Sequence, residues 1–349
     1  MAEHSEVVWM AQPSRGLALS LTSRALGRKL CRVLATQLAQ MNNLSIFLVA
    51  ALLTTTSVSA QSDCSPLGLT SDLLEDAYAS GFSSIEDKSI PEFLKGMPSC
   101  LSSVDPFFRD QIAYEGTATL LRRNDVADPQ LISALRALRQ DLVERLDDSV
   151  SDPDGVMKPF AAIVLAEVAR TDRISPWMTA EERLDSVAVA SRYLSEVADY
   201  RAFEDGVGFR HGVAHGADLV LQLALNPEIP SEALLPLVDA ISVQVAPQSG
   251  VAYITGEPDR LARALFYLMQ RAENSDPLRQ RITNLVTTLS DPAPYETWAS
   301  VFRSEKSLTF CHNRRAFISA LYLRASPHAD HELIAPFMGP LEAALNTVP

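Results

Sequence analysis

The sequence predicts an all-α protein, and three observations support this fold class. Apolar residues recur at intervals of three and four through most of the chain, the spacing of a buried helical face. Residues that start helices (Ser, Thr, Asp and Pro) precede these stretches repeatedly. No stretch alternates between apolar and polar residues as a half-buried strand does.

The composition is that of a globular protein. Of 349 residues, 47% are hydrophobic and 21% are charged, enough apolar side chains to fill a large core. After residue 60, no Gly-, Ser- or Pro-rich stretch is long enough to act as a flexible linker. We therefore expect 61–349 to form a single helical-repeat domain.

Residues 1–60 are predicted to be an N-terminal extension and a signal peptide. A short apolar run over 44–53 is followed by small residues, a pattern that favours cleavage after Ala60. The run is shorter than the roughly 20 apolar residues that span a bilayer, so no stable membrane span is expected after cleavage. Met41 is the favoured translation start, and an organelle transit peptide over 15–40 is the alternative. The predicted location is periplasmic or secreted.

The predicted mature chain is strongly acidic. Residues 1–60 hold five basic and two acidic side chains, so 61–349 hold 25 basic and 41 acidic ones, a formal charge of −16. Such a surface repels nucleic-acid phosphates and anionic lipids at long range. We expect no nucleic-acid partner, and the predicted ligand is a peptide, a glycan or a small molecule.

Three cysteines follow residue 60. Cys64 and Cys100 flank the first helical segment and are the favoured disulfide pair in an exported chain. Cys311 stands beside His312, but neighbouring helix residues point about 100° apart, so a buried free cysteine is favoured over a nucleophile with its base.

Two expected helices begin with an N-cap residue followed by proline. Asp128-Pro129 precedes a helix over 131–146, and Asp276-Pro277 precedes one over 278–289. In both, the Asp side chain is expected to accept a hydrogen bond from a free backbone N–H group.

Another helix begins with a capping box. Thr179 and Glu182 have the required spacing ahead of a helix over 184–197. The remaining helices are expected over 107–122, 160–170, 208–225, 231–245, 259–272, 313–324 and 331–345.

Two stretches of the chain resemble each other. LAEVARTDRISPWMTAEERLDSV and LQLALNPEIPSEALLPLVDAI both run from a helix end through a Pro-containing turn and a Ser/Thr-Glu cap into a new helix. Such repetition is typical of a HEAT/armadillo-like α-solenoid of packed antiparallel helix pairs. We therefore expect this architecture.

The helix expected over 208–225 is apolar except for one polar stripe. His211, His215, Asp218 and Gln222 fall within about 60° of arc on a helix with 3.6 residues per turn. Solvent-facing stripes are usually rich in Lys, Glu and Arg, so this one is expected to line a ligand pocket.

Three interpretations of the stripe stay open. The first is a binding pocket in an exported helical-repeat protein. The second is a hydrolase, in which His211, His215 and Asp218 hold a divalent metal, or Asp218 orients His215 as a general base. No cofactor is required by the sequence. The third is that these groups hydrogen-bond inside the protein without further function.

A second candidate binding group follows the stripe in the sequence. It consists of Tyr253, Glu257, Asp259, Arg260 and Arg263, of which Tyr253, Asp259 and Arg260 are the predicted binding residues. Asp259 is expected to cap the helix over 259–272, and Arg260 is expected to form an ion pair with an acid elsewhere in the site. The alternative is a surface cap with solvated charges.

These motifs resemble a known family. GFRHGVAHGADLVLQLALNP, preceded by LAEVARTDR and followed by GEPDRLARAL and NRRAFISALYLR, resembles the bacterial family called domain of unknown function 2785, over roughly 107–324. The resemblance implies an all-helical, repeat-like fold whose most distinctive motif is His-x-x-x-His, here His211 and His215 with Asp218. It implies no activity, and a leader peptide is a departure from the family.

Overall fold

The computed structural model describes residues 64–123 and 128–349, and almost all the regular structure in these ranges is helical. Contacts group Ser62–Pro349 into one unit. The expected extension, the signal peptide, the Met41 start and the cleavage point after Ala60 lie outside the described residues. Within the described ranges, no helix combines the length and the hydropathy that crossing a bilayer requires.

The helices follow one another along the chain with short connections; η denotes a 3₁₀ or π turn. In order they are η2 (Pro66–Gly68), α3 (Ser71–Ala79), η3 (Asp87–Ser89), α4 (Ile90–Gly96), η4 (Met97–Cys100), η5 (Phe107–Gly116), α5 (Thr117–Arg122), α6 (Pro129–Arg145), α7 (Met157–Ile174), α8 (Ala180–Glu196), α9 (Gly212–Ala224), η6 (Ser231–Leu234), α10 (Leu235–Val245), α11 (Glu257–Arg271), η7 (Ala272–Asn274), α12 (Asp276–Thr288), η8 (Trp298–Arg303), α13 (Glu305–Ala325), η9 (Ser326–His328) and α14 (Ala335–Thr347).

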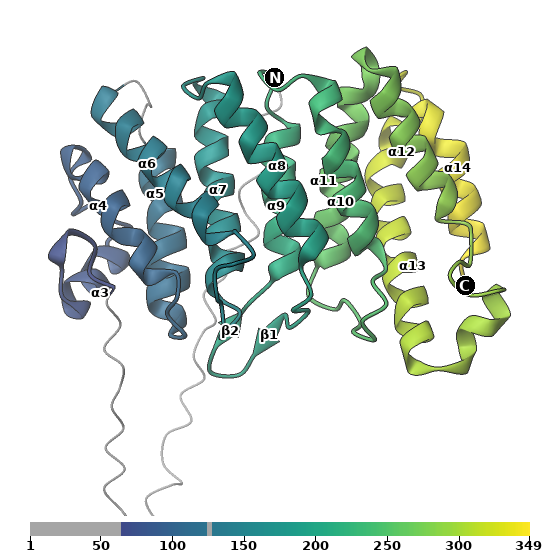
Figure 1. Cartoon of the computed structure of the whole chain (residues 1–349), viewed down its shortest axis with the longest axis horizontal. Coiled ribbons are helices and arrows are strands. Elements are labelled where there is room, and N and C mark those ends of the chain that lie inside the picture. The colour runs from purple at the N-terminus through teal and green to yellow at the C-terminus, as the bar shows by residue number, and fades with distance from the viewer. Residues whose placement is uncertain (1–63, 124–127) are drawn as a thin grey trace, which may run out of the picture. The chain divides into compact units, whose positions relative to one another are not determined.

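The longer helices lie in two layers (Figure 1). In layer A, defined as α5, α7, α9, α11 and α13, each helix packs on the next. In layer B, defined as α6, α8, α10, α12 and α14, the last four pack in the same way, and side chains of α6 bond to α8. Consecutive helices run antiparallel, and most of these pairs, such as α6 with α7 and α8 with α9, pack on each other across the layers. The predicted all-α fold class is confirmed.

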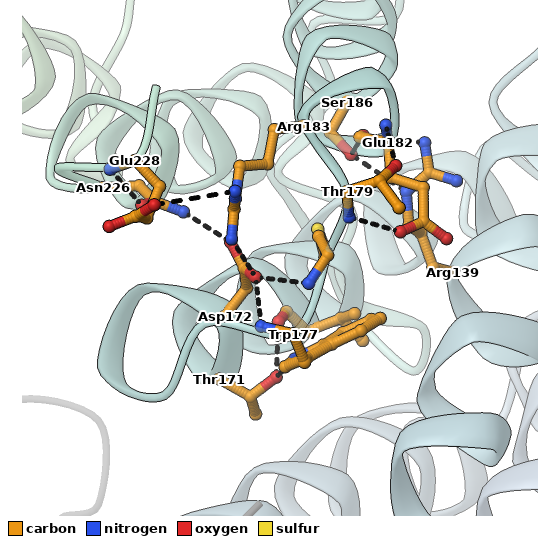
Figure 2. A network of polar contacts seen from close by, with 12 residues as sticks. Arg139, Thr171, Asp172, Trp177, Thr179, Glu182, Arg183, Ser186, Asn226 and Glu228 are labelled. Atoms are coloured by element: carbon orange, nitrogen blue, oxygen red, sulfur yellow. Dashed lines mark hydrogen bonds and ion pairs between the residues drawn. The ribbon is translucent and has the colours of Figure 1, made fainter. Parts of the chain in front are cut away.

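The turn between α7 and α8 is held by a buried carboxylate (Figure 2). Asp172 is fully buried and accepts N–H bonds from Trp177 and Met178 at 2.8 and 2.7 Å. It also accepts two bonds from the Arg183 guanidinium, at 2.7 and 3.0 Å. Asn226, just after α9, donates to the same carboxylate at 2.8 Å. The two stretches that resemble each other in sequence therefore touch at the ends of α7 and α9.

Two of the predicted helix starts are confirmed. The Asp128 side chain accepts a bond from the Gln130 N–H at 3.0 Å at the start of α6. Thr179 and Glu182 form both bonds of the predicted capping box at the start of α8.

Two predicted caps are wrong. The N-cap of α12 is Ser275, whose hydroxyl accepts the Leu278 N–H, and Asp276 is the first helical residue. The N-cap of α11 is Gly256, whose φ of 100° suits glycine, so the helix starts before Asp259. In both cases the true cap lies earlier in the chain than the acidic residue that the prediction chose.

The helix predicted over 208–225 begins at Gly212 instead. Two short antiparallel strands precede it, β1 (Phe203–Glu204) and β2 (Gly208–Phe209), with Phe203 opposite Phe209. Gly206 and Gly208 have φ values of 85° and 81°, which the turn requires. Strands of two residues are too short to produce an alternating pattern, so the sequence analysis missed them.

The cysteines are arranged as a disulfide and a free thiol. Cys64 and Cys100 are bonded to each other, 36 residues apart in the chain. Cys311 is free and buried on α13, as the sequence predicts.

Candidate functional site

The polar stripe begins at the first turn of α9, which packs between α7 and α11. His211 is the N-cap residue, in the left-handed region with φ 55°, and it is 8% exposed. Its ring stacks on Phe209 of β2, with 4.2 Å between the centroids. The hairpin therefore covers the start of the stripe.

His215 lies one turn further on and faces α7. Its Nδ1 is 3.1 Å from the Pro159 carbonyl oxygen, and its ring meets the Phe160 ring edge to face at 5.0 Å. Burial lowers the pKa of His215 well below its usual value. Burial also lowers the pKa of His211, to about 4, although Glu257 acts in the opposite direction. Both imidazoles are therefore neutral near pH 7.

Asp218 faces the other way, towards α11. Its carboxylate forms an ion pair with Arg260. Burial raises the pKa of Asp218 to about 6, against the opposing effect of Arg260 and Arg263. The structure therefore does not join Asp218 to His215, whose bonded partner is the Pro159 carbonyl, and the expected acid/base pair is not formed.

The three candidate metal ligands do not converge. Among the residues that the structure describes, no three His, Cys, Asp or Glu side chains are placed to hold a metal ion. The reason is that His215 turns towards α7, whereas Asp218 turns towards α11. In the described structure these three side chains therefore do not form a metal-binding cluster.

The other predicted site residues are spread over different places. Gln222 is half-buried on α9, and within the described ranges its buried Oε1 has no hydrogen-bond partner. Tyr253 is buried. Its hydroxyl donates a hydrogen bond to Gln244 at 3.2 Å, and its backbone N–H donates one to Asn313 at 2.7 Å, so both groups are used inside the protein. Asp259 is exposed in the first turn of α11.

Side chains that sequence reasoning missed complete a charged surface on layer A. Arg122 of α5 donates to Glu167 of α7 through Nε at 3.1 Å and through a second, shorter bond. Burial is the main cause that raises the pKa of Tyr114 in η5. The negative charges of Glu167 and Asp218 raise this pKa further. Tyr114 stands four residues after Asp110, a spacing that puts both side chains on one helix face, whereas Arg122 and Glu167 carry no such local signal in the sequence.

Three ion pairs link neighbouring helices of layer A. Arg122–Glu167 joins α5 to α7, Asp218–Arg260 joins α9 to α11, and Asp259–Arg324 joins α11 to α13. We call these six residues the ion-pair row. The Arg122 and Arg260 side chains are 36% and 23% exposed, whereas those of Glu167 and Asp218 are 6% and 13% exposed, so in these two pairs it is the arginine that solvent reaches.

Two hollows of the surface lie away from the stripe. One, of about 680 Å³, lies along α6 and is lined by Ile132, Arg136 and Glu182 among others. The other, of about 430 Å³, lies where Tyr200 and Arg201 meet Val251. Neither hollow is lined by a residue of the stripe.

These features define an all-α protein of antiparallel helices with a charged surface along one layer. Residues 142–323 match the family described as protein of unknown function (DUF2785), and the chain belongs to this family. The matched range runs from α6 into α13 and contains the whole stripe, although it starts later than the expected residue 107. No curated protein and no solved structure matches the chain.

Proposed function

We propose that the protein is an exported helical-repeat binding protein, a HEAT/armadillo-like α-solenoid that holds a peptide against the open side of layer A. The observation that carries this proposal is the ion-pair row, in which charged side chains follow one another across five successive helices of the layer. A row of this kind suits an extended ligand that crosses the helices rather than a compact one that fills a cavity.

The contacts between equivalent points of successive helix pairs support the solenoid. Asn226 after α9 bonds to Asp172 at the end of α7. Arg271 at the end of α11 donates to the carbonyl oxygens of Ala224 and Asn226 at 2.8 and 2.7 Å. Each helix pair thus contacts the next at its turn, which is the nearest-neighbour arrangement of a repeat protein.

The dimensions of the layer favour a peptide over a small molecule. Packed helices lie about 8–10 Å apart, which corresponds to about three residues of extended chain. A peptide crossing layer A would therefore present a new side chain to each helix in turn. The partly exposed guanidinium groups of the row and the exposed Asp259 carboxylate can bond both to its backbone and to its charged side chains.

Two features support export. The apolar run over 44–53 ends close to the favoured cleavage point after Ala60. The disulfide between Cys64 and Cys100 begins four residues after that point, and disulfides persist in oxidising compartments. N-terminal sequencing of the protein secreted by a bacterial host tests this: a mature chain starting at Gln61 supports export, and an intact N-terminus contradicts it.

The alternative is a metal-dependent or acid/base hydrolase that uses the same stripe. No contact among the described residues supports it. Its metal ligands do not converge, and Asp218 is paired with Arg260 rather than with His215.

A peptide-capture experiment tests the binding proposal. The purified full-length protein is immobilised and exposed to a pool of random twelve-residue peptides, and retained peptides are counted by mass spectrometry. The layer A variant Asp218→Asn/Arg260→Gln should lose most of the retention. The matched control Asp239→Asn/Arg281→Gln removes an exposed ion pair between α10 and α12 of layer B and should keep it. Equal retention by all three proteins contradicts the proposal, provided that circular dichroism shows each to be folded.

A further inference from the structure

Three arginines gather where α5 and α7 end on layer A. Arg122 is the last residue of α5, and Arg170 and Arg173 lie in the last turns of α7. Glu167, Arg170 and Arg173 follow one another at intervals of three residues on α7, so their side chains share one face of that helix, and Arg122 is bonded to Glu167. Burial is the main cause that lowers the pKa of Arg170; Glu167 acts against it, and Arg122 and Arg173 add to it.

This cluster holds more positive charge than its carboxylate balances. Glu167 is bonded to Arg122 through two of the Arg122 nitrogens. Neither Arg170 nor Arg173 forms a hydrogen bond or an ion pair with any residue that the structure describes, and the Nε of Arg173 is buried without a partner there. A buried donor that bonds to nothing is destabilising, so an incoming acceptor would be stabilised at this place.

We propose that Arg122, Arg170 and Arg173 form a carboxylate-binding site, which seats an acidic residue of the peptide held on layer A. This inference rests on the proposed function, because the cluster lies at one end of the ion-pair row, beside Glu167. The planar fork of a guanidinium matches a carboxylate with two parallel hydrogen bonds. The preferred peptide is therefore acidic.

The overall negative charge of the protein and the positive arginine cluster predict opposite effects of salt on the binding of an acidic peptide. Residues 61–349 carry a formal charge of −16, so an acidic peptide is repelled at long range. Salt screens this repulsion and would strengthen binding if no local site existed. Salt weakens binding if direct contacts with the three arginines dominate. The sign of the salt dependence thus separates the two cases.

The experiment measures the affinity of the full-length protein for two rhodamine-labelled twelve-residue peptides, one alternating Ala and Glu, the other alternating Ala and Gln. We expect the Glu peptide to bind at least about tenfold more tightly, and its affinity to fall as salt is added. Arg170→Gln/Arg173→Gln should lose that preference. Arg281→Gln/Arg303→Gln, which removes the same charge from exposed positions on α12 and η8, should keep it.

A second variant covers the case in which the glutamines disturb folding. Arg170→Lys/Arg173→Lys keeps the charge but loses the forked geometry, and it should bind the Glu peptide with an intermediate affinity. Sodium acetate and sodium chloride at the same ionic strength are added as competitors. Stronger displacement of the Glu peptide by acetate supports a carboxylate site, and equal displacement by the two salts overturns it.

Failure of this inference differs from failure of the proposed function. If both peptides bind equally and binding still depends on Asp218 and Arg260, the arginine site is wrong and the peptide surface stands. If neither the random pool nor either peptide is retained through layer A, both proposals are wrong.

Discussion

Asn226 donates a hydrogen bond from its side-chain Nδ2 to Oδ2 of Asp172, over 2.8 Å. Asp172 lies near the end of α7, and Asn226 lies just after α9, so this bond joins the turns of two successive helix pairs (Figure 2). Burial acts to raise the pKa of Asp172, but the Arg183 guanidinium and the backbone N–H groups outweigh it and hold that pKa below its usual value. The carboxylate is therefore ionised and fully bonded inside the protein.

Removal of this carboxylate should be strongly destabilising. Asp172→Ala leaves the Arg183 guanidinium without its buried partner and two backbone N–H groups without acceptors. Loss of one partner from a buried pair costs about 3–5 kcal/mol, so we expect a fall of that size in the free energy of unfolding. Urea denaturation followed by circular dichroism measures it.

An exposed aspartate provides the control for this experiment. Asp239 pairs with Arg281, and the two side chains are 53% and 46% exposed. Asp239→Ala should lower the free energy of unfolding by less than about 1 kcal/mol, because solvent screens the pair. Similar losses in the two variants would show that the Asp172 network contributes no more than a surface ion pair.

The disulfide should contribute measurably to stability. Cys64 and Cys100 are 36 residues apart, and the loop-entropy estimate for a closure of that length is about 4 kcal/mol. A reducing agent should lower the urea midpoint of the wild-type protein and leave that of Cys64→Ser/Cys100→Ser unchanged. Cys311→Ser should respond to the reducing agent as the wild type does. A wild-type midpoint that is insensitive to reduction counts against the prediction.

A glycine in the middle of α9 should not tolerate alanine. A Cβ on Gly216 of α9 would lie 3.0 Å from Leu194 Cδ1 and 3.1 Å from Tyr193 Cε1, and both neighbours are buried. Gly216→Ala should therefore destabilise the protein by about 1–3 kcal/mol through overpacking. Thermal unfolding of the variant measures this loss, and a melting temperature that is unchanged or raised would refute the packing argument.

The fold was predictable wherever its determinants are close together in the sequence. The capping box of Thr179 and Glu182 spans four residues, and it forms as predicted. The role of Asp259 was not predictable, because the cap of α11 depends on the backbone of Gly256, while Asp259 bonds to Arg324, 65 residues away. Local patterns reveal helices, whereas contacts between helices decide what a polar residue at a helix start does.

The same distinction applies to the candidate site: local patterns predicted which residues it contains, but not their partners on other helices. Helical periodicity placed His211, His215 and Asp218 on one stripe, and the sequence suggested an acid as the partner of Arg260. Periodicity could not show that His215 faces the Pro159 carbonyl or that Arg122 pairs with Glu167, since these partners lie on other helices. Arg122 and Glu167 make the stripe part of a charged surface, and only tertiary packing brings them close to it.

The ionisation of Asp218 should make stability depend on pH. Its pKa is raised by burial from 3.8 to about 6 in the folded protein. A raised folded pKa gives a stabilisation that is complete below pH 3.8 and is lost as the pH rises through 6. Asp218→Asn cannot titrate there, so the free energy of unfolding of the wild type relative to this variant should fall by up to about 3 kcal/mol between about pH 4 and pH 7.

His211 acts with the opposite sign in the same range. Its pKa is lowered from 6.5 to about 4, so its stabilisation is present above pH 6.5 and is lost as the pH falls through 4. Because His211 is present in both proteins, its contribution largely cancels when the two free energies of unfolding are subtracted. Urea denaturation at a series of pH values gives that difference. A difference that does not change with pH would mean that Arg260 keeps Asp218 ionised throughout, and that burial does not control this carboxyl group.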